Sequence, residues 1–219
     1  MIVPALITCG LLIATIGNAH AQVHRCERAG KIAFSDQPCE VGDKASQKVY
    51  SSSAASNALD MQVVVTHYSV EGMSDAALAR SLKANGPGGF HGLASWNVSF
   101  NYTTKKRSDA CEIDAVRIKV SGEILMPRWT DESSAPPPLQ ERWRKYYAAL
   151  KRHEDGHIQH GKELALRVAE RLMGIGAMPC GQIQSLAQGE FQRTYNNQKT
   201  RDQEYDARTN HGKAEGAVF

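Results

Sequence analysis

Apolar and polar residues alternate in several segments of the chain, which predicts β-strands there. Apolar side chains stand at every second position of 94–104, "ASWNVSFNYTT", as in a half-buried strand. The same alternation runs through 111–127, "CEIDAVRIKVSGEILMP", and 61–70, "MQVVVTHYSV", is rich in β-forming residues. We therefore expect three strands between residues 61 and 127.

Other segments have the period of a helix. A helix is expected over 74–86, with Ser74 as its N-cap and Gly86 at its end. A long helical pattern runs from Leu139 to Met173, and a further amphipathic helix follows Cys180. Strands followed by helices are typical of an α+β domain, here with a small antiparallel sheet.

The long helix carries one apolar stripe, formed by Trp143, Tyr147, Leu150, Leu164 and Val168. Continued in steps of three or four residues, the stripe passes through Glu154, His157 and Gly161. These positions should face the interior, where a carboxylate is costly unless it has a role. Gly156 in mid-helix costs ~1 kcal/mol relative to Ala, and it indicates that another segment comes close there.

The same stretch contains His153-Glu154-Asp155-Gly156-His157, which fits the pattern H-E-x-x-H. Histidines four residues apart lie on one face of a helix, so both imidazoles can converge on one Zn²⁺. Glu154 is one step round the helix and can take a proton from water that the metal activates. The pattern predicts zinc as the cofactor, with His153 and His157 as ligands and Glu154 as the catalytic base.

A third zinc ligand has four candidates: His160, Glu163, Asp206 and His211. The first two share the motif's helix and would need that helix to break, whereas good helix formers follow them. His211 is the expected ligand, because neutral imidazole suits zinc and Gly212 would let the backbone pass close to the site. Asp206 could instead orient a ligand imidazole, and Tyr205 is a catalytic candidate for stabilising the oxyanion.

The first 60 residues divide into three segments. Residues 1–21 carry no charge, have an apolar centre and end in Ala-His-Ala, which predicts a signal peptide cleaved after Ala21. Residues 22–43 are predicted to form a small β module, and the Ser- and Ala-rich residues 44–60 a flexible linker. The main domain then covers 61–219. No later segment approaches 18 apolar residues, so we expect a secreted or periplasmic protein without a membrane span after signal removal.

Composition and cysteines fit this interpretation. Of the 219 residues 42% are hydrophobic and 22% charged, and the net charge of +3 comes from interspersed acids and bases. These values are typical of a soluble globular protein and give no nucleic-acid footprint. Four cysteines remain after the signal, an even number that favours disulfides in an exported chain. Their spacing favours the pairs Cys26–Cys39 and Cys111–Cys180.

Two resemblances extend these predictions. Residues 22–43 resemble a family of small bacterial envelope modules of unknown function, through Cys26, Gly30, Lys31, Phe34, Ser35, Asp36, Pro38 and Cys39. Residues 61–219 resemble a bacterial family described as predicted secreted zinc-dependent proteases. That match rests on Tyr68, Val70, Gly72, Gly86, Pro87, Trp96, Cys111, Pro127, Trp129, Trp143, the H-E-x-x-H segment and the closing "YDARTNHGKAEGAVF". It implies a zincin-like hydrolase in which His153 and His157 bind zinc and Glu154 is the general base.

The leading hypothesis is a secreted zinc metallopeptidase that acts on a peptide or protein substrate, with cell-envelope material as one source. The strand edge at 111–126 is the candidate for pairing with the substrate backbone. The main alternative is a non-catalytic envelope binding protein that zinc stabilises. A periplasmic metal-storage protein is a third hypothesis, against which the lack of a His-rich tract argues.

Overall fold

The structure is a computed structural model that describes residues 22–28, 31–35, 44–50, 53–54 and 57–219. Its elements follow in the order β1 (Gln22–Arg28), β2 (Lys31–Ser35), β3 (Lys44–Tyr50), β4 (Ser53–Ala54), β5 (Asn57–Val70), α1 (Asp75–Asn85), η1 (Pro87–Gly89), β6 (Leu93–Arg107), β7 (Ala110–Trp129), η2 (Glu132–Ser134), α2 (Pro137–Met173), η3 (Cys180–Gln182), α3 (Ile183–Thr209) and η4 (Lys213–Glu215). The α+β class is confirmed. None of the described helices combines the length and the apolar content that a membrane crossing requires.

The main sheet is mixed, so the expected antiparallel sheet is wrong for one of its pairs. The strand order is β4-β5-β7-β6. β7 pairs antiparallel with β6 and parallel with β5. The chain reverses direction twice between β5 and β7, and β7 lies between β5 and β6. Alternation along a strand shows which face is buried but not which neighbour pairs with it.

The strands and α2 form the core on one face of the sheet. The buried positions of β7 recur at every second residue and are Val116, Ile118, Val120, Ile124 and Met126. Gly122 interrupts this row, and a methyl group placed on it would lie 2.8 Å from Cδ1 of Ile158 on α2. A methyl group on Gly161 would likewise lie 2.8 Å from Cγ of Trp96 on β6. Glycine at these two contacts lets α2 approach the sheet closely beside His157.

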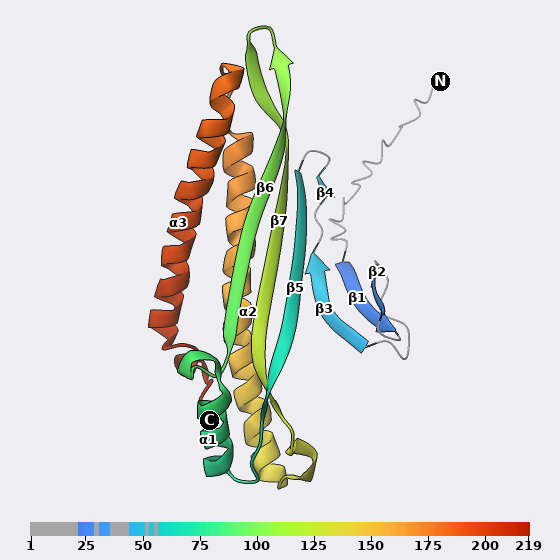
Figure 1. Ribbon diagram of the computed structural model, residues 1–219, viewed down its shortest axis with the longest axis vertical. Helices are drawn as coiled ribbons and strands as arrows, with labels where there is room; N and C mark the ends of the chain where they lie inside the picture. Colours follow the sequence, from blue (N-terminus) through green and yellow to red (C-terminus); the bar gives the residue numbers. More distant parts are fainter. Residues whose placement is uncertain (1–21, 29–30, 36–43, 51–52, 55–56) are drawn as a thin grey trace, which may run out of the picture.

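The two long helices lie side by side, and α3 also runs next to β6 (Figure 1). A disulfide joins Cys111 at the start of β7 to Cys180 at the start of η3, with their Cα atoms 4.8 Å apart. This predicted pair is therefore confirmed. Backbone hydrogen bonds between Cys111 and Met178 fix the same junction. The chain consequently enters α3 from a point anchored on the sheet.

Strands β1, β2 and β3 form a separate sheet of order β2-β1-β3. Part of the predicted linker is thus a strand, because Lys44–Tyr50 pairs antiparallel with β1. The strand expected from residue 61 begins earlier, at Asn57. The predicted signal peptide and the Cys26–Cys39 pair lie outside the residues and side chains that the structure describes.

Candidate metal centre

The H-E-x-x-H segment lies near the middle of α2 and faces the interior. The side chains of His153, Glu154 and His157 are buried, with 2%, 4% and 7% of their surface exposed. The inward orientation expected from the apolar stripe is confirmed. Gly156 contacts Tyr205 of α3, since a methyl group there would lie 2.6 Å from the tyrosine oxygen. The close approach expected at this glycine is therefore made by α3.

Three side-chain atoms converge at the centre of the site. Nε2 of His153 lies 3.3 Å from Nε2 of His157. Oδ1 of Asp206 lies 3.2 Å from the first nitrogen and 3.1 Å from the second. Tetrahedral ligands at bond lengths of 2.0–2.1 Å would be about 3.3–3.4 Å apart. Two imidazole nitrogens and one carboxylate oxygen at these spacings could hold a metal ion.

Carboxylates hold the opposite nitrogen of each imidazole. Nδ1 of His153 lies 3.1 Å from Oε2 of Glu215, and Nδ1 of His157 lies 2.8 Å from Oδ1 of Asp202. A carboxylate at Nδ1 keeps the proton on that nitrogen, so the lone pair of Nε2 points into the centre. Both histidines therefore turn Nε2 toward Asp206 and toward each other.

Helix α3 supplies two of these carboxylates from positions one turn apart. Asp202 and Asp206 lie on the same face of α3, four residues apart, opposite the motif of α2. The sequence interpretation named Asp206 only as an alternative, and it missed Asp202 and Glu215. A D-x-x-x-D spacing on a helix that follows the motif is the signal that could have identified the two aspartates.

The other third-ligand candidates lie off the centre. Nδ1 of His160 lies 2.7 Å from Oδ1 of Asp202, which places His160 in a second group with His157. Glu163 pairs with Arg167 at 3.4 Å. Both stay on the unbroken helix, as its helix-forming residues predicted.

His211, the expected third ligand, is placed beside the centre and not in it. It follows the end of α3, and its Nδ1 lies 3.3 Å from Oδ1 of Asp206. Its side chain is 46% exposed and its ring packs against Phe90, with centroids 4.7 Å apart. Because Asp206 comes from within α3, it reaches the two imidazoles. Of the two described groups that could hold a metal, one contains Asp206 and neither contains His211. Asp206, and not His211, therefore lies against both imidazole nitrogens.

Tyr205 also has a different place from the one expected for an oxyanion donor. Its hydroxyl lies 3.1 Å from Oε2 of Glu215 and its ring stacks on His153 at 4.9 Å. It is not among the residues that line the pocket in front of the site. Tyr205 instead positions Glu215, the carboxylate that orients His153. Burial, followed by Glu215, raises the pKa of this phenol.

Glu154 has the environment of a general base. Burial is the main cause that raises its pKa to about 7, and Asp206 adds to it, while His157 and the Ala94 amide act in the opposite direction. A carboxyl with a pKa near neutrality exchanges protons readily at physiological pH. Gly92 packs directly against Oε1, so a side chain at that position would displace the carboxylate.

The histidines respond differently to the same surroundings. Burial, and then His157, lower the pKa of His153 in spite of its carboxylate partners. Burial alone would lower the pKa of His157 too, but the hydrogen bond that His157 donates to Asp202 and the charges of three carboxylates outweigh it and raise that pKa. The site concentrates negative charge around two imidazoles, a charge pattern that a divalent cation would neutralise.

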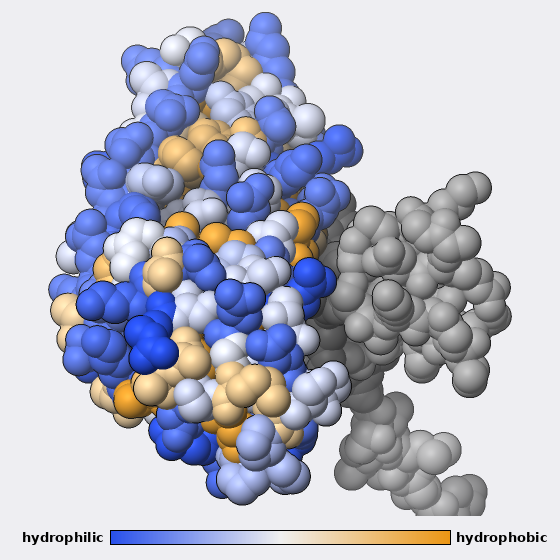
Figure 2. Space-filling view, turned by 60° about the horizontal axis from the view of Figure 1, so that its bottom comes forward, coloured by the Kyte–Doolittle hydropathy of each residue, from blue (hydrophilic) through white to orange (hydrophobic). Residues whose placement is uncertain are grey.

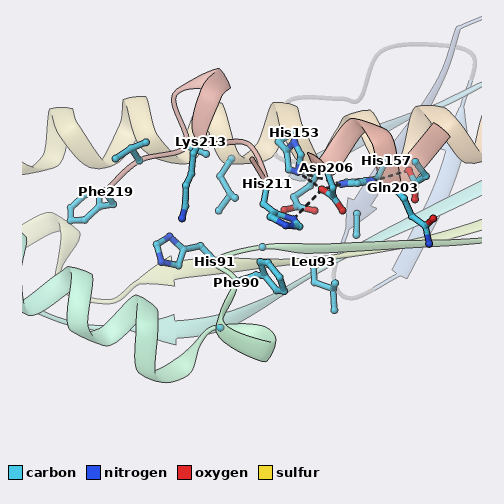
Figure 3. Close-up of a pocket in the computed structure, with 18 of the residues that line it drawn as sticks. Phe90, His91, Leu93, His153, His157, Gln203, Asp206, His211, Lys213 and Phe219 are labelled. Atoms are coloured by element: carbon cyan, nitrogen blue, oxygen red, sulfur yellow. Dashed lines mark hydrogen bonds and ion pairs between the residues drawn. The ribbon is translucent and has the colours of Figure 1, made fainter. Parts of the chain in front are cut away.

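A pocket of ≈ 630 Å³ opens in front of these residues, a size typical of ligand sites. Figure 3 shows Asp206 between His153, His157 and His211 at its wall. Three of the six exposed large hydrophobic residues of the described chain border it, namely Phe90, Leu93 and Val218. On the face that Figure 2 shows, apolar residues occur in small patches scattered among polar ones. The pocket therefore combines a polar wall with an apolar rim.

The strand edge beside the pocket belongs to β6. The expected edge at 111–126 is wrong, because β7 pairs on both sides. β6 is the last strand of the main sheet, and its first residues, Leu93 and Ala94, line the pocket together with Gly92. This edge strand of the described main sheet thus begins at the pocket that Glu154 also lines.

Comparison with known protein families matches residues 65–212 to the family described as "Bacterial protein of unknown function (DUF922)". The match spans more than half of the chain, so the protein belongs to this family. It includes all of α2, all of α3 and the residues of the candidate centre except Glu215. Neither the curated proteins nor the solved structures gave a match.

Proposed function

We propose that this member of the DUF922 family is a zinc-dependent peptidase with a zincin-like fold. The observation that carries the proposal is the convergence of Nε2 of His153, Nε2 of His157 and Oδ1 of Asp206 at 3.1–3.3 Å from one another. The buried carboxylate of Glu154 lies on the same helix, and a pocket opens in front of it. These features fit the general base and the substrate site of a metallohydrolase.

Three protein ligands are typical of a catalytic zinc site, whereas a structural site is closed by four. Within the described residues no fourth donor joins the group of His153, His157 and Asp206. All three residues line the pocket. This favours hydrolysis over the alternative of a binding protein that zinc merely stabilises.

When bound, zinc would supply Lewis acidity, which polarises a carbonyl group and makes water a stronger acid. Glu154 takes the proton of the attacking water, and the protonated carboxyl then delivers it to the leaving amine. His211 stands at the pocket side of Asp206 and donates a hydrogen bond to the carbonyl oxygen as negative charge develops there. The free edge of β6 aligns an extended peptide by backbone hydrogen bonds.

Secretion or a periplasmic location remains part of the proposal. The Cys111–Cys180 disulfide fits an oxidising compartment, because cytosolic thiols are kept reduced. Peptides, proteins or the peptide part of cell-envelope material are the proposed substrates.

The test is metal-dependent hydrolysis by the full chain. The protein is purified from an oxidising compartment, treated with a chelator, and incubated with a peptide library before and after one equivalent of Zn²⁺ is added. The proposal expects cleavage only with the metal, at defined positions in the library. Absence of cleavage by protein that carries one zinc would contradict it.

A further inference from the structure

One lysine of the pocket is held in a fixed place beside the metal centre. Lys213 begins η4, directly after three successive residues with left-handed backbone, Asn210, His211 and Gly212, at φ 49°, 52° and 79°. A methyl group on Gly212 would lie 2.9 Å from Cγ of His153, so this turn packs directly against the imidazole of His153. Figure 3 shows the Lys213 side chain extending from the turn toward His91, with His211 and Phe219 on either side.

The ammonium group of Lys213 has no ion pair with any acid in the part of the chain that the structure describes. The neighbouring acids are already engaged: Glu215 with His153 and Tyr205, and Asp206 with the histidines of the centre. The other lysine of the pocket, Lys199, has partners, since it lies 3.9 Å from Asp202 and over the ring of Trp96. Lys213 is therefore the cation of this pocket that remains available to a ligand.

The surroundings of Lys213 leave it accessible to an anion. Lys213 is exposed, and the pocket that it lines also includes the apolar residues Leu150, Ala217 and Phe219. Because Lys213 is exposed, solvent screens a charge pair with it more than a pair in the interior. The field of Lys213 reaches His91 across the pocket, where, after burial, it is the second cause that lowers the imidazole pKa.

We propose that Lys213 binds a carboxylate of the substrate and so makes the enzyme selective for peptides that carry one at a fixed distance from the cleaved bond. The inference rests on the proposed function, because it assumes that the pocket holds a peptide. Two sources supply the same chemistry: the free carboxylate at a peptide C-terminus, and the side chain of Asp or Glu.

The experiment measures binding and cleavage separately. Two synthetic peptide libraries are used, one with free C-terminal carboxylates and one with C-terminal amides, and each contains Glu and Gln at every varied position. Retention is measured by equilibrium dialysis and mass spectrometry on the full-length zinc-loaded Glu154→Gln protein. This variant lacks the proposed general base and therefore should not cleave the peptides during dialysis. The same protein carrying Lys213→Met is the test variant, and Lys199→Met is the matched control in the same pocket.

Retention of carboxylate-bearing peptides should exceed that of their neutral counterparts at least tenfold, the effect of about one charge-assisted hydrogen bond. Lys213→Met should abolish this preference and Lys199→Met should keep it. Preference between the libraries would identify the terminal carboxylate, and preference for Glu over Gln within one library would identify the side chain. Equal retention of charged and neutral peptides, or a preference that survives Lys213→Met, would overturn the proposal.

The outcome is separable from that of the proposed function. If the wild-type protein cleaves the libraries without any preference for carboxylates, only the assignment of Lys213 fails. If it cleaves nothing while the dialysis preference depends on Lys213, the carboxylate site stands and the peptidase proposal fails.

Discussion

At the residue scale, the proposed zinc chemistry depends on which side chain joins the two histidines. His153, Glu154 and His157 could be found from the sequence. A spacing of four places the two histidines on one face of a helix, and Glu154 directly follows the first of them. The third partner comes from α3, and its identity depends on which face of α3 meets α2. That relation is set by tertiary packing, so the sequence left four candidates open and favoured His211 over Asp206.

Substitution of the third partner distinguishes these candidates. Asp206→Asn should weaken zinc binding by more than the roughly 10–100-fold expected for Asp202→Asn, which removes only an outer partner. His211→Ala should change zinc affinity less than tenfold, because Nδ1 of His211 contacts the aspartate and not the two imidazole nitrogens. Competition titration with a chromogenic chelator measures all three variants. A larger loss for His211→Ala than for Asp206→Asn would return the third position to His211.

Glu154 should make the metal-free protein less stable as the pH rises. Its pKa is raised from 4.5 to about 7, so the protonated form contributes stability that is fully present below pH 4.5 and is lost as the pH rises through 7. Glu154→Gln removes this dependence, and above pH 8 it should stabilise the apoprotein by roughly 3 kcal/mol. Urea unfolding in the presence of a chelator, at pH 5 and pH 8.5, measures the effect. An equal difference between variant and wild type at the two pH values would contradict it.

At the element scale, the strands and helices of the main domain could largely be predicted, whereas their pairing could not. Alternation identified β6 and β7, and the helical stripe identified α2 together with its buried face. The alternation of apolar and polar residues along β5 and β7 does not show that these two strands pair in parallel. The exposed strand edge was assigned to residues 111–126 for the same reason, whereas β7 is an inner strand and β6 an edge strand of the described sheet.

The closeness of α2 and α3 should make Gly156 intolerant of a side chain. Gly156→Ala improves helix propensity by up to about 1 kcal/mol, but its methyl group would lie 2.6 Å from the Tyr205 oxygen. Overpacking should outweigh the gain and destabilise the protein by about 1–3 kcal/mol. Gly189→Ala on α3 is the control, since a methyl group there meets nothing within 4 Å and should stabilise by about 0.5–1 kcal/mol. Urea denaturation compares the two, and equal stabilisation by both would refute the contact.

The Cys111–Cys180 disulfide should stabilise the junction between β7 and α3. It closes a loop with a sequence separation of 69, for which chain entropy gives about 4 kcal/mol. The double variant Cys111→Ser, Cys180→Ser should lose an amount of that order in the free energy of unfolding. Denaturant titration of oxidised wild type and double variant tests this, and unchanged midpoints would count against the bond's role.

At the scale of the whole molecule, the site is assembled from parts that are distant in the sequence. α2 supplies the two histidines and Glu154, α3 supplies Asp202 and Asp206, and the segment after α3 supplies His211, Lys213 and Glu215. The loop before β6 completes the pocket. The sequence indicated that the closing segment mattered, because it keeps Tyr205, Asp206, His211 and two glycines in a stretch that has little reason to be apolar core. Its return onto α2 is a property of the fold and could not be read from local pattern.

The central claim is that Glu154 acts as the base of a zinc hydrolase. The most direct measurement compares zinc content and peptide cleavage in the same preparations of wild type, Glu154→Gln and Glu163→Gln. Glu163 lies on the same helix and faces Arg167, so its variant controls for the loss of a helical carboxylate. All three should bind one zinc per chain, and only Glu154→Gln should lose cleavage, by at least about a hundredfold. Cleavage by Glu154→Gln at the wild-type rate, with zinc bound, would contradict the account.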